Sequence, residues 1–375
     1  MDNRTLRKTT DIAGLILISI FTLFVFSPSV LAGGCTVRYW VGGTGNWSDA
    51  TNHWATTTGG VPGAGNTPGT GNCTFFDSNS SSTSYVVTVN TTATSSNLTF
   101  ANPASGSPTL TGSSAMNFYS SLVLVSGMGW TYNGPITFSP PDTSRQITTA
   151  GVTLNSAITF NGIGGWVLQD DFNNSSSSIT LTQGALDTNG KTVTANSFTS
   201  NNSNNIRTLS LGSSVINVLG GGNWSISSTS TGMTFNAGTS KIVMTGGVGG
   251  IFTGGGLTYN ELDLSPGFNS TIAGSNTFIN LIATSTGANQ KIVFASNTIT
   301  TVTNFKVNGT ATNLLALNSS STSTFSLVKS GEGNVSVDYL SISSSTVTPA
   351  NNWYAGTHSV DGGGNSGWIF NSPSW

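Results

Sequence analysis

Hydrophobic and polar residues alternate over short runs along most of the chain. The runs break at Gly, Asn, Asp or Ser every few positions, most regularly between residues 151 and 308, as in TLNSAITF and KTVTANSF. A period of two residues is the pattern of a half-buried β-strand and not of a helix. The chain is therefore predicted to be all-β and to consist of many short strands.

Two segments nearly repeat each other. Residues 153–166 read TLNSAITFNGIGGW and residues 208–224 read TLSLGSSVINVLGGGNW, each with two strand-like runs, a glycine-rich turn and a tryptophan. A strand-only unit that recurs at roughly 20 to 30 residues indicates a solenoid whose coils bury their apolar faces against one another. We predict a right-handed parallel β-helix (β-solenoid), with repeats at 81–345 between an N-terminal cap at 33–80 and a C-terminal cap at 346–375.

The corners of such coils need residues that tolerate left-handed backbone geometry, which Asn and Gly do. Aligned Asn side chains can also hydrogen-bond between stacked turns. The predicted corners are Asn189 with Gly190, Asn236 with Gly238, and Asn308 with Gly309.

The first 32 residues have the arrangement of a secretory signal. Three basic residues precede an apolar run at 12–26, and Val30 and Ala32 fit the −3 and −1 positions of a cleavage site. A membrane anchor needs about 20 apolar residues, which is longer than this run. We expect a secreted or cell-surface protein with no membrane span after signal cleavage.

Cys35 and Cys73 are the two cysteines of the chain. In an oxidising compartment two lone cysteines are best paired with each other. The closed loop of about 38 residues would stabilise the fold by roughly 3 to 4 kcal/mol. The alternative is a lipidated N-terminus at Cys35, because the preceding LAGG loosely resembles a lipobox, although Ala32 stands where a large aliphatic residue is expected.

Aromatic residues concentrate at both predicted ends. Trp40, Trp47 and Trp54 are spaced seven apart, and the closing segment carries Trp353 and Trp368. These indoles can cap the open hydrophobic ends, as repeat proteins require. The N-terminal three can alternatively stack on sugar rings, since an indole packs well on the C–H face of a pyranose.

The N-terminal segment YWVGGTGNWSDATNHW, followed by PG and FFD, resembles the start of β-helical passenger regions in bacterial secreted and autotransporter-like surface proteins, which are pectin-lyase-like solenoids. WVLQDDF, ITLTQGALDTNGKTVTA and RTLSLGSS are similar to uncharacterised repeat proteins of bacteria and their phages. The resemblance implies a β-helical fold and a surface setting, and it implies no activity.

Charged residues make up 6% of the chain and the net charge is −2, so the sequence offers no electrostatic footprint for nucleic acid. The two histidines, His53 and His358, fall in opposite caps and have no acidic partner nearby in the sequence. Both are expected to be packed or solvated cap residues. No catalytic residue and no cofactor is assigned.

An enzyme on this scaffold remains the alternative. The best acid and base set for a polysaccharide lyase or glycoside hydrolase is Asp170, Asp171, Asp187, Lys191 and Arg207. Adjacent residues of a strand point to opposite sides, so only one of the paired aspartates could join a given site. Asp361 and Asn365 form a weak calcium candidate, because a single carboxylate falls short of the usual ligand set.

We therefore expect a structural or adhesive role. An adhesin of this kind would contact glycans or other cell-surface components, with self-association as a further expectation. The scarcity of acids and histidines favours this role over polysaccharide cleavage. A virion fibre is a third setting, which the signal segment argues against.

Overall fold

The computed structural model of the chain describes residues 34–101, 106–201, 204–227, 231–245, 249–265, 269–285 and 287–370. The chain divides into two compact units, Met1–Cys35 and Thr36–Trp375. The expected signal segment at 1–32 lies outside the described residues. No helix in the described part of the chain is long and apolar enough to span a membrane.

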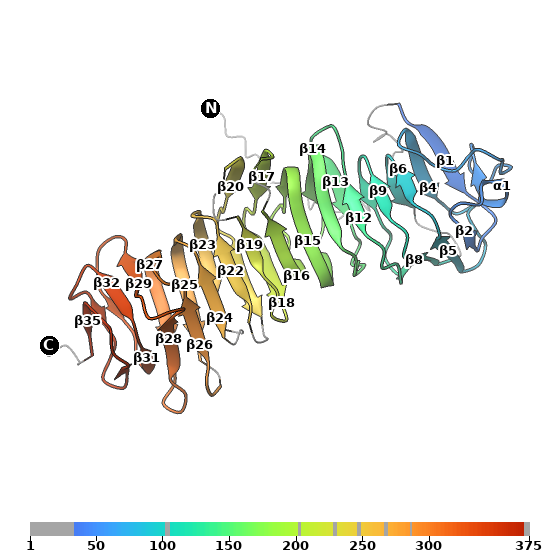
Figure 1. Cartoon of the computed structure of the whole chain (residues 1–375). Coiled ribbons are helices and arrows are strands. Elements are labelled where there is room, and N and C mark those ends of the chain that lie inside the picture. Colours follow the sequence, from blue (N-terminus) through green and yellow to red (C-terminus); the bar gives the residue numbers. More distant parts are fainter. Residues whose placement is uncertain are drawn as a thin grey trace, which may run out of the picture. The chain divides into compact units, whose positions relative to one another are not determined.

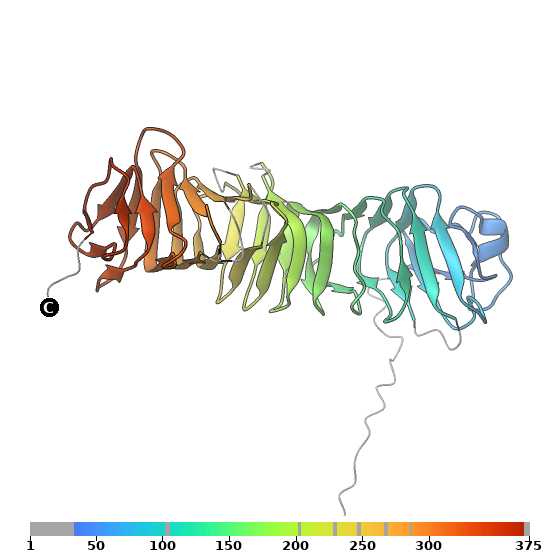
Figure 2. The ribbon, with the colours of Figure 1, turned by 90° about the horizontal axis from the view of Figure 1, so that it is seen from below.

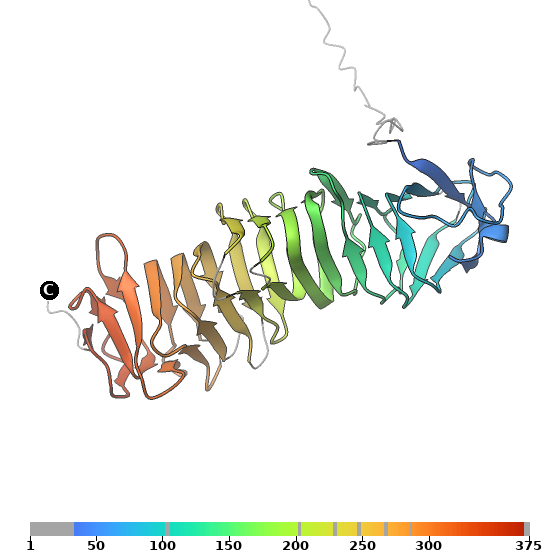
Figure 3. The same ribbon diagram turned by 45° about the horizontal axis from the view of Figure 1, so that its top comes forward.

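The unit from Thr36 on is a parallel β-solenoid, which confirms the predicted all-β fold class. Its strands follow one another from β1 to β35 (Figure 1), and strands of neighbouring coils lie side by side in the other two views (Figure 2, Figure 3). The strands stack on three sides, which we call faces A, B and C. The ladder of pairings is continuous on face A, whereas on face B it is interrupted between β20 and β23, and on face C after β11 and again before β30. Each coil passes through A, then B, then C before it returns to A one level further along.

Face A runs through most of the solenoid. It contains β6 (Ala93–Ser95), β9 (Met116–Phe118), β12 (Ile136–Phe138), the first part of β14 (Ile158–Leu168), the middle of β15 (Phe172–Asp187), the second part of β16 (Val193–Ser200), β19 (Trp224–Ile226), β22 (Ile251–Gly254), β24 (Ser270–Ala273), β26 (Lys291–Phe294), β28 (Leu315–Ser319), β31 (Leu340–Ile342) and β34 (Val360–Asp361).

Face B begins with the first strand of the solenoid. It contains β1 (Thr36–Trp40), β4 (Asn72–Phe76), β7 (Leu98–Phe100), β10 (Leu122–Val123), β13 (Arg145–Thr148), the last parts of β14 and β15, β17 (Arg207–Ser210) and β20 (Met233–Asn236). It continues with the first parts of β23 (Thr258–Asp263), β25 (Asn276–Thr284) and β27 (Ile299–Asn308), then β29 (Phe325–Lys329) and β32 (Ser345–Thr348).

Face C is the third side. It contains β2 (Gly45–Asn46), β5 (Tyr85–Val89), β8 (Pro108–Gly112), β11 (Gly129–Trp130), the first parts of β15 and β16, β18 (Val215–Leu219), β21 (Lys241–Thr245), the last parts of β23, β25 and β27, and finally β30 (Val335–Ser336), β33 (Trp353–Tyr354) and β35 (Trp368–Ile369).

The coil length stays close to the range that the sequence predicts. Along face A, residues at the same level are separated by as few as 19 residues, from Ile179 to Phe198, and by as many as 28, from Trp224 to Phe252. The near-repeat in the sequence is not a structural repeat, however. Trp166 pairs with Leu186 on face B, whereas Trp224 pairs with Phe198 on face A. Because the corners differ in length, matching positions of the two sequence segments fall on different faces.

Inward-pointing side chains stack from coil to coil to form the core. Strands of the form Ile-Thr-Phe, such as β12, bury their first and third residues and leave the second half-buried, as the period of two requires. From β9 to β26 the inward column of face A is at most 4% exposed at each level and consists of Met116, Ile136, Ile158, Ile179, Phe198, Trp224, Phe252, Ile272 and Phe294. Full burial of such a side chain stabilises the folded state by about 1.5 to 3 kcal/mol.

The predicted corners are partly confirmed. Asn189 and Gly190 both have left-handed backbone, with φ of 51° and 69°, and Gly238 has φ of 57°. Asn308 and Gly309 also lie at a corner, after the end of β27, and the Asn308 side-chain oxygen accepts a bond from the Asp338 amide of the next coil, but neither residue has left-handed backbone. Gly309 is needed for space instead, since a Cβ there would lie 2.0 Å from the Tyr339 carbonyl oxygen.

Candidate functional surfaces

The three N-terminal tryptophans form a packed end cap. Trp40, Trp47 and Trp54 are 0%, 1% and 0% exposed, and the Trp40–Trp54 and Trp47–Trp54 ring centroids are both 4.9 Å apart in edge-on contacts. Phe76 stacks on Trp40 at 5.7 Å and on Phe100 of the next coil at 4.3 Å. The cluster thus closes the aromatic core, and it leaves no indole face on which a sugar could stack.

The cap has its own local structure. A short helix, α1 (Ala50–His53), is capped by Asp49, whose carboxylate accepts bonds from the Asn52 amide and side chain. The helix leads into β3 (Trp54–Ala55), which pairs antiparallel with β1. His53 is buried at the end of α1, stacks on Trp40 at 4.5 Å and contacts the Val41 carbonyl oxygen through Nδ1 at 2.8 Å. The ring is a packed residue of the cap.

Cys35 and Cys73 are joined by a disulfide, as the sequence predicts. Cys73 lies on β4, is 0% exposed and accepts a bond from the Asn97 side chain at 3.3 Å. The cross-link ties the residue before β1 to the strand with which β1 pairs.

The acids of the set proposed from the sequence serve as hydrogen-bond acceptors for backbone amides. Asp170 accepts the Thr149 and Ala150 amides of the preceding coil, with a distance of 2.8 Å to Thr149 N. Asp171 accepts the Thr192 amide of the following coil at 2.8 Å. The adjacent carboxylates therefore serve opposite neighbours along the stack and act as ties between coils.

The remaining members of that set, Asp187, Lys191 and Arg207, also have structural surroundings. Lys191 is half-buried, and its backbone amide donates to the Thr188 carbonyl oxygen at 2.9 Å. Asp187 closes its own turn by accepting the Asn189 amide at 2.8 Å. Arg207 is 0% exposed, and its guanidinium donates to the carbonyl oxygens of Ser200 at 2.7 Å, Thr231 at 2.8 Å and Asn205 at 3.2 Å. Buried cations need such partners. Arg207 thus fastens the wide corner between faces A and B.

The calcium candidate is a hydrogen-bonded turn. The Asp361 carboxylate accepts the Gly363 amide at 2.9 Å and the Asn365 side chain at 2.6 Å. The Asn365 oxygen is itself engaged by the Ser345 amide at 3.0 Å. Calcium takes six to eight oxygen ligands, and the described residues contain no group of three or more His, Cys, Asp or Glu side chains that could hold a metal.

A charged cluster that sequence reasoning missed lies on face C. Lys241 Nζ is 2.7 Å from Asp263 Oδ2 and 3.4 Å from Glu261 Oε1. Hydrogen bonding to Asp263 raises the Lys241 pKa. Burial raises the pKa of Asp263, but the bonds from Lys241 and Ser265 outweigh it and leave that pKa below its ordinary value. Only the pairing of β21 with β23 brings these residues together, across 20 positions of sequence.

The pKa shifts of this cluster indicate whether it is suited to acid–base catalysis. A general acid or base is most effective when its pKa lies near the working pH. Lys241 and Asp263 are both shifted away from neutrality, which keeps them charged. The directions of these pKa shifts are therefore those of a structural ion pair.

The expectation that neither histidine has an acidic partner is wrong for His358. Its Nδ1 lies 2.7 Å from Asp338 Oδ2, and its ring stacks on Tyr339 with centroids 4.5 Å apart. Tyr339 has a left-handed backbone with φ of 58°, which is rare for a bulky residue. Asp338 Oδ1 accepts the amides of Tyr339 and His358 and so holds this corner of the C-terminal cap.

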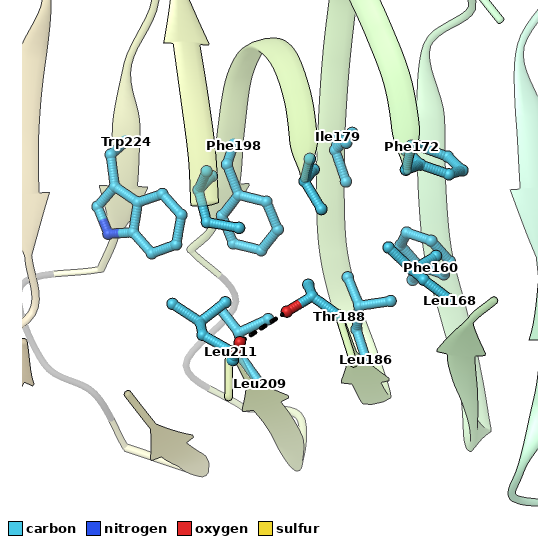
Figure 4. Close-up of a pocket in the computed structure, with 12 residues that line it drawn as sticks. Phe160, Leu168, Phe172, Ile179, Leu186, Thr188, Phe198, Leu209, Leu211 and Trp224 are labelled. Carbon is cyan, nitrogen blue, oxygen red and sulfur yellow. Dashed lines mark hydrogen bonds between the residues drawn. The ribbon is translucent and has the colours of Figure 1, made fainter. Parts of the chain in front are cut away.

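A narrow void lies inside the coils between Phe160 and Trp224 (Figure 4). Its lining is hydrophobic except for Thr188, whose hydroxyl is 3.2 Å from the Leu211 carbonyl oxygen. The space would hold no more than about one water molecule, and apolar voids of this kind stay dry. It is a packing gap in the core.

An open groove lies over the corner between faces C and A in three successive coils. The corners precede β24, β26 and β28, and the lining consists of Asn269, Ala288, Asn289, Gln290, Lys291, Thr312, Asn313, Leu314 and Ala316. We call it the amide groove. Asn269 and Asn289 have left-handed backbone, with φ of 55° and 59°. The sequence shows the Asn residues, but only the stacking of coils places them in one groove.

The groove presents unused hydrogen-bonding groups. Asn289 and Lys291 are exposed, and among the described residues neither side chain has a hydrogen-bond or ion-pair partner. Asn313 donates to the Thr312 hydroxyl at 3.1 Å. An amide offers both donors and an acceptor, and a lysine offers three donors. The groove can thus bind a ligand that is rich in hydroxyl groups.

Comparisons with protein-family models, with curated proteins and with solved structures found no match to this chain, so the fold and its surfaces carry the functional argument.

Proposed function

We propose that this protein is an exported β-solenoid with a structural or adhesive role, which contacts glycans or other cell-surface components and catalyses no reaction. The single observation that supports glycan contact is the amide groove, with its exposed Asn289 and Lys291 side chains. Sugar hydroxyls both donate and accept hydrogen bonds, and amide groups match them in both senses. The stacked coils beneath hold the three corners in register, so the groove is organised before the ligand arrives.

The features that favour adhesion over catalysis are the use of the acids in structural hydrogen bonds and the ionisation of the Lys241 cluster. Asp170 and Asp171 are used as ties between different coils. Export, proposed from the residues at 1–32, would place such a solenoid where glycans are found. The resemblance of the N-terminal segment implies the same setting and is part of this proposal.

Glycan binding tests this proposal directly. The full chain, expressed for export and purified, is applied to a broad glycan array, and each bound polysaccharide is incubated with the protein and calcium before product analysis. We expect binding without shortened products. The double substitution Asn289→Ala with Lys291→Ala should abolish binding, whereas Lys191→Ala, which removes a surface lysine on another coil, should not.

Two results would contradict the proposal. Shortened polysaccharide products would establish catalysis and make Lys241, Glu261 and Asp263 the first residues to substitute. Glycan binding that is equally strong in the double variant and in wild type would move the binding surface away from the amide groove.

A further inference from the structure

A second outward-facing surface has a more regular composition than the groove. On the outer side of face A, Thr137, Thr159, Thr180 and Thr199 pair in register across four successive coils. We call these four residues the threonine strip. The same column continues with Asn117 and Thr94 on one side and with Ser225 and Thr253 on the other. A hydroxyl or amide side chain thus stands at every level from β6 to β22.

The strip has a rigid backing. Each threonine lies between two inward residues of its strand, as Thr137 lies between Ile136 and Phe138, both 0% exposed. Beneath the strip the Phe138 and Phe160 rings stack at 5.2 Å. Neighbouring strands of a sheet lie about 4.7 to 4.9 Å apart, and β-branched side chains have few χ1 rotamers. The strip therefore repeats one methyl and one hydroxyl group at a single spacing.

The hydroxyl groups of the strip are available to a ligand. The four threonines are half-buried, and none of their hydroxyls has a hydrogen-bond partner within the described ranges of the chain. Residues two positions before and after each threonine are all uncharged and none is aromatic: Pro135, Ser139, Ala157, Asn161, Ser178, Thr182, Ser197 and Asn201. The strip thus offers neither ion pairs nor aromatic stacking.

These properties select the kind of ligand. Acidic ligands need cations, and the strip and its neighbouring outward residues carry none. A column of identical neutral groups at one spacing matches a ligand that is itself neutral, rigid and periodic. The hydroxyl of threonine donates one hydrogen bond and accepts others, as water does, and its methyl group borders ordered water without competing for its hydrogen bonds.

We propose that the threonine strip binds the surface of ice. The strip is separate from the amide groove, because it lies on the outer side of face A between β12 and β16, whereas the groove lies at the corners before β24, β26 and β28. The inference therefore goes beyond the proposed glycan contact and does not depend on it.

The test follows the partition of the purified, fluorescently labelled protein into slowly growing ice, together with the gap between melting and freezing temperatures. The strip variants are Thr159→Lys and Thr180→Lys, with Thr159→Val and Thr180→Val as smaller changes. Thr208→Lys is the matched control, because Thr208 is a half-buried outward threonine on face B, paired with Ala185 and Thr234. Circular dichroism and thermal melting confirm that each variant is folded.

We expect wild type and Thr208→Lys to enter the ice and to delay freezing, and both lysine variants of the strip to lose both effects. The valine variants, which keep the shape and remove the hydroxyl, should be weaker than wild type. Exclusion of wild type from ice would overturn the inference even where glycan binding is found. Equal incorporation of the strip variants would also overturn it, as would equal loss in Thr208→Lys. Absent glycan binding with intact ice binding would reject only the adhesive proposal.

Discussion

The two ends of the solenoid are both covered by aromatic residues, but the N-terminal cap buries its tryptophans more completely than the C-terminal cap does. Each must cover the last coil, whose apolar interior would otherwise face water. At the N-terminal end Trp40, Trp47 and Trp54 are at most 1% exposed, and β3 pairs antiparallel onto β1. At the C-terminal end Trp353 is fully buried, but Trp368, in edge-on contact with it at 5.3 Å, is only half-buried.

The difference indicates which cap is the more stable. The N-terminal cap combines an aromatic cluster, a helix turn and a disulfide, whereas the C-terminal cap closes with two-residue strands β33, β34 and β35. Val360 on β34 is 49% exposed. Because each coil of a solenoid contacts only its neighbours, local opening begins where the terminal interface is weakest. We expect unfolding to start at the C-terminal end.

Substitution of the central N-terminal indole should have the largest effect. Trp54 contacts both other tryptophans and Phe76, and its Nε1 donates to the Trp47 carbonyl oxygen at 2.7 Å. Trp54→Ala should cost about 3 to 5 kcal/mol, as large aromatic deletions in cores do. Denaturant unfolding measures this loss of stability, and hydrogen exchange at β1 and β4 locates it. A cost no greater than that of the corresponding C-terminal change would remove the distinction between the ends.

Loss of the disulfide should follow in size. Replacement of Cys35 and Cys73 by Ala should reduce stability by about 3 to 4 kcal/mol through the freed loop. The effect should be confined to the N-terminal cap, with the rest of the solenoid still folded. Limited proteolysis with mass analysis locates the new cleavage sites. Unchanged melting and protease sensitivity would mean that the aromatic cluster holds this end without the cross-link.

The matching change at the other end should be smaller. Trp368 is half-buried, and its Nε1 donates to the Ser345 hydroxyl at 3.0 Å. Trp368→Ala should cost about 1 to 2 kcal/mol, since only part of the apolar area is lost. Faster hydrogen exchange should appear at β33 and β35 and not at β1. Exchange that instead accelerates along all coils alike would contradict local opening at this end.

The smallest effect concerns acid stability of the C-terminal cap. Burial raises the pKa of Asp338, but hydrogen bonds from His358 and from the Tyr339 and His358 amides outweigh it and hold the pKa below its ordinary value of 3.8. A lowered pKa stabilises the fold above pH 3.8, and that contribution is lost as the pH falls through the lower folded value. Wild type should therefore exceed Asp338→Asn in melting temperature at pH 7.

That difference between wild type and Asp338→Asn should shrink as the pH falls below 3.8, and melting curves at a series of pH values measure it. Asp49→Asn, at the N-terminal end, serves as the matched carboxylate control, because the Asp49 pKa is also lowered, chiefly by the Asn52 side chain. A gap that stays constant over the whole range would show that Asp338 acts through packing and not through its charge.

Much of the fold follows from local pattern. Alternation in strands such as β12 and β16 fixes which side chains point inward, and the presence of two cysteines predicts their pairing. The corner at Asn189 and Gly190 follows from residue type. The corner at Asn308 and Gly309 follows as well, but its geometry does not, because the approach of the Tyr339 carbonyl oxygen from the next coil, and not left-handed backbone, requires the glycine.

The surfaces could not be predicted in the same way. Which residues pair between neighbouring coils depends on the length of each corner. Because coils range from 19 to 28 residues, the sequence does not show which residues stand at the same level. The near-repeat ending in Trp166 and Trp224 is misleading for this reason, since the two indoles lie on different faces. Likewise Asp338 and His358 are 20 positions apart and meet only across one coil.

The residue pattern alone specifies a strand-rich solenoid with apolar residues inside and Ser, Thr and Asn outside, because strand periodicity and residue volume act locally. Which outward residues stand together depends on how the coils stack. The threonine strip, the amide groove and the Lys241 cluster each join residues about 20 or more positions apart. Register between coils is a property of the whole stack, because each corner sets the level at which the next strand begins.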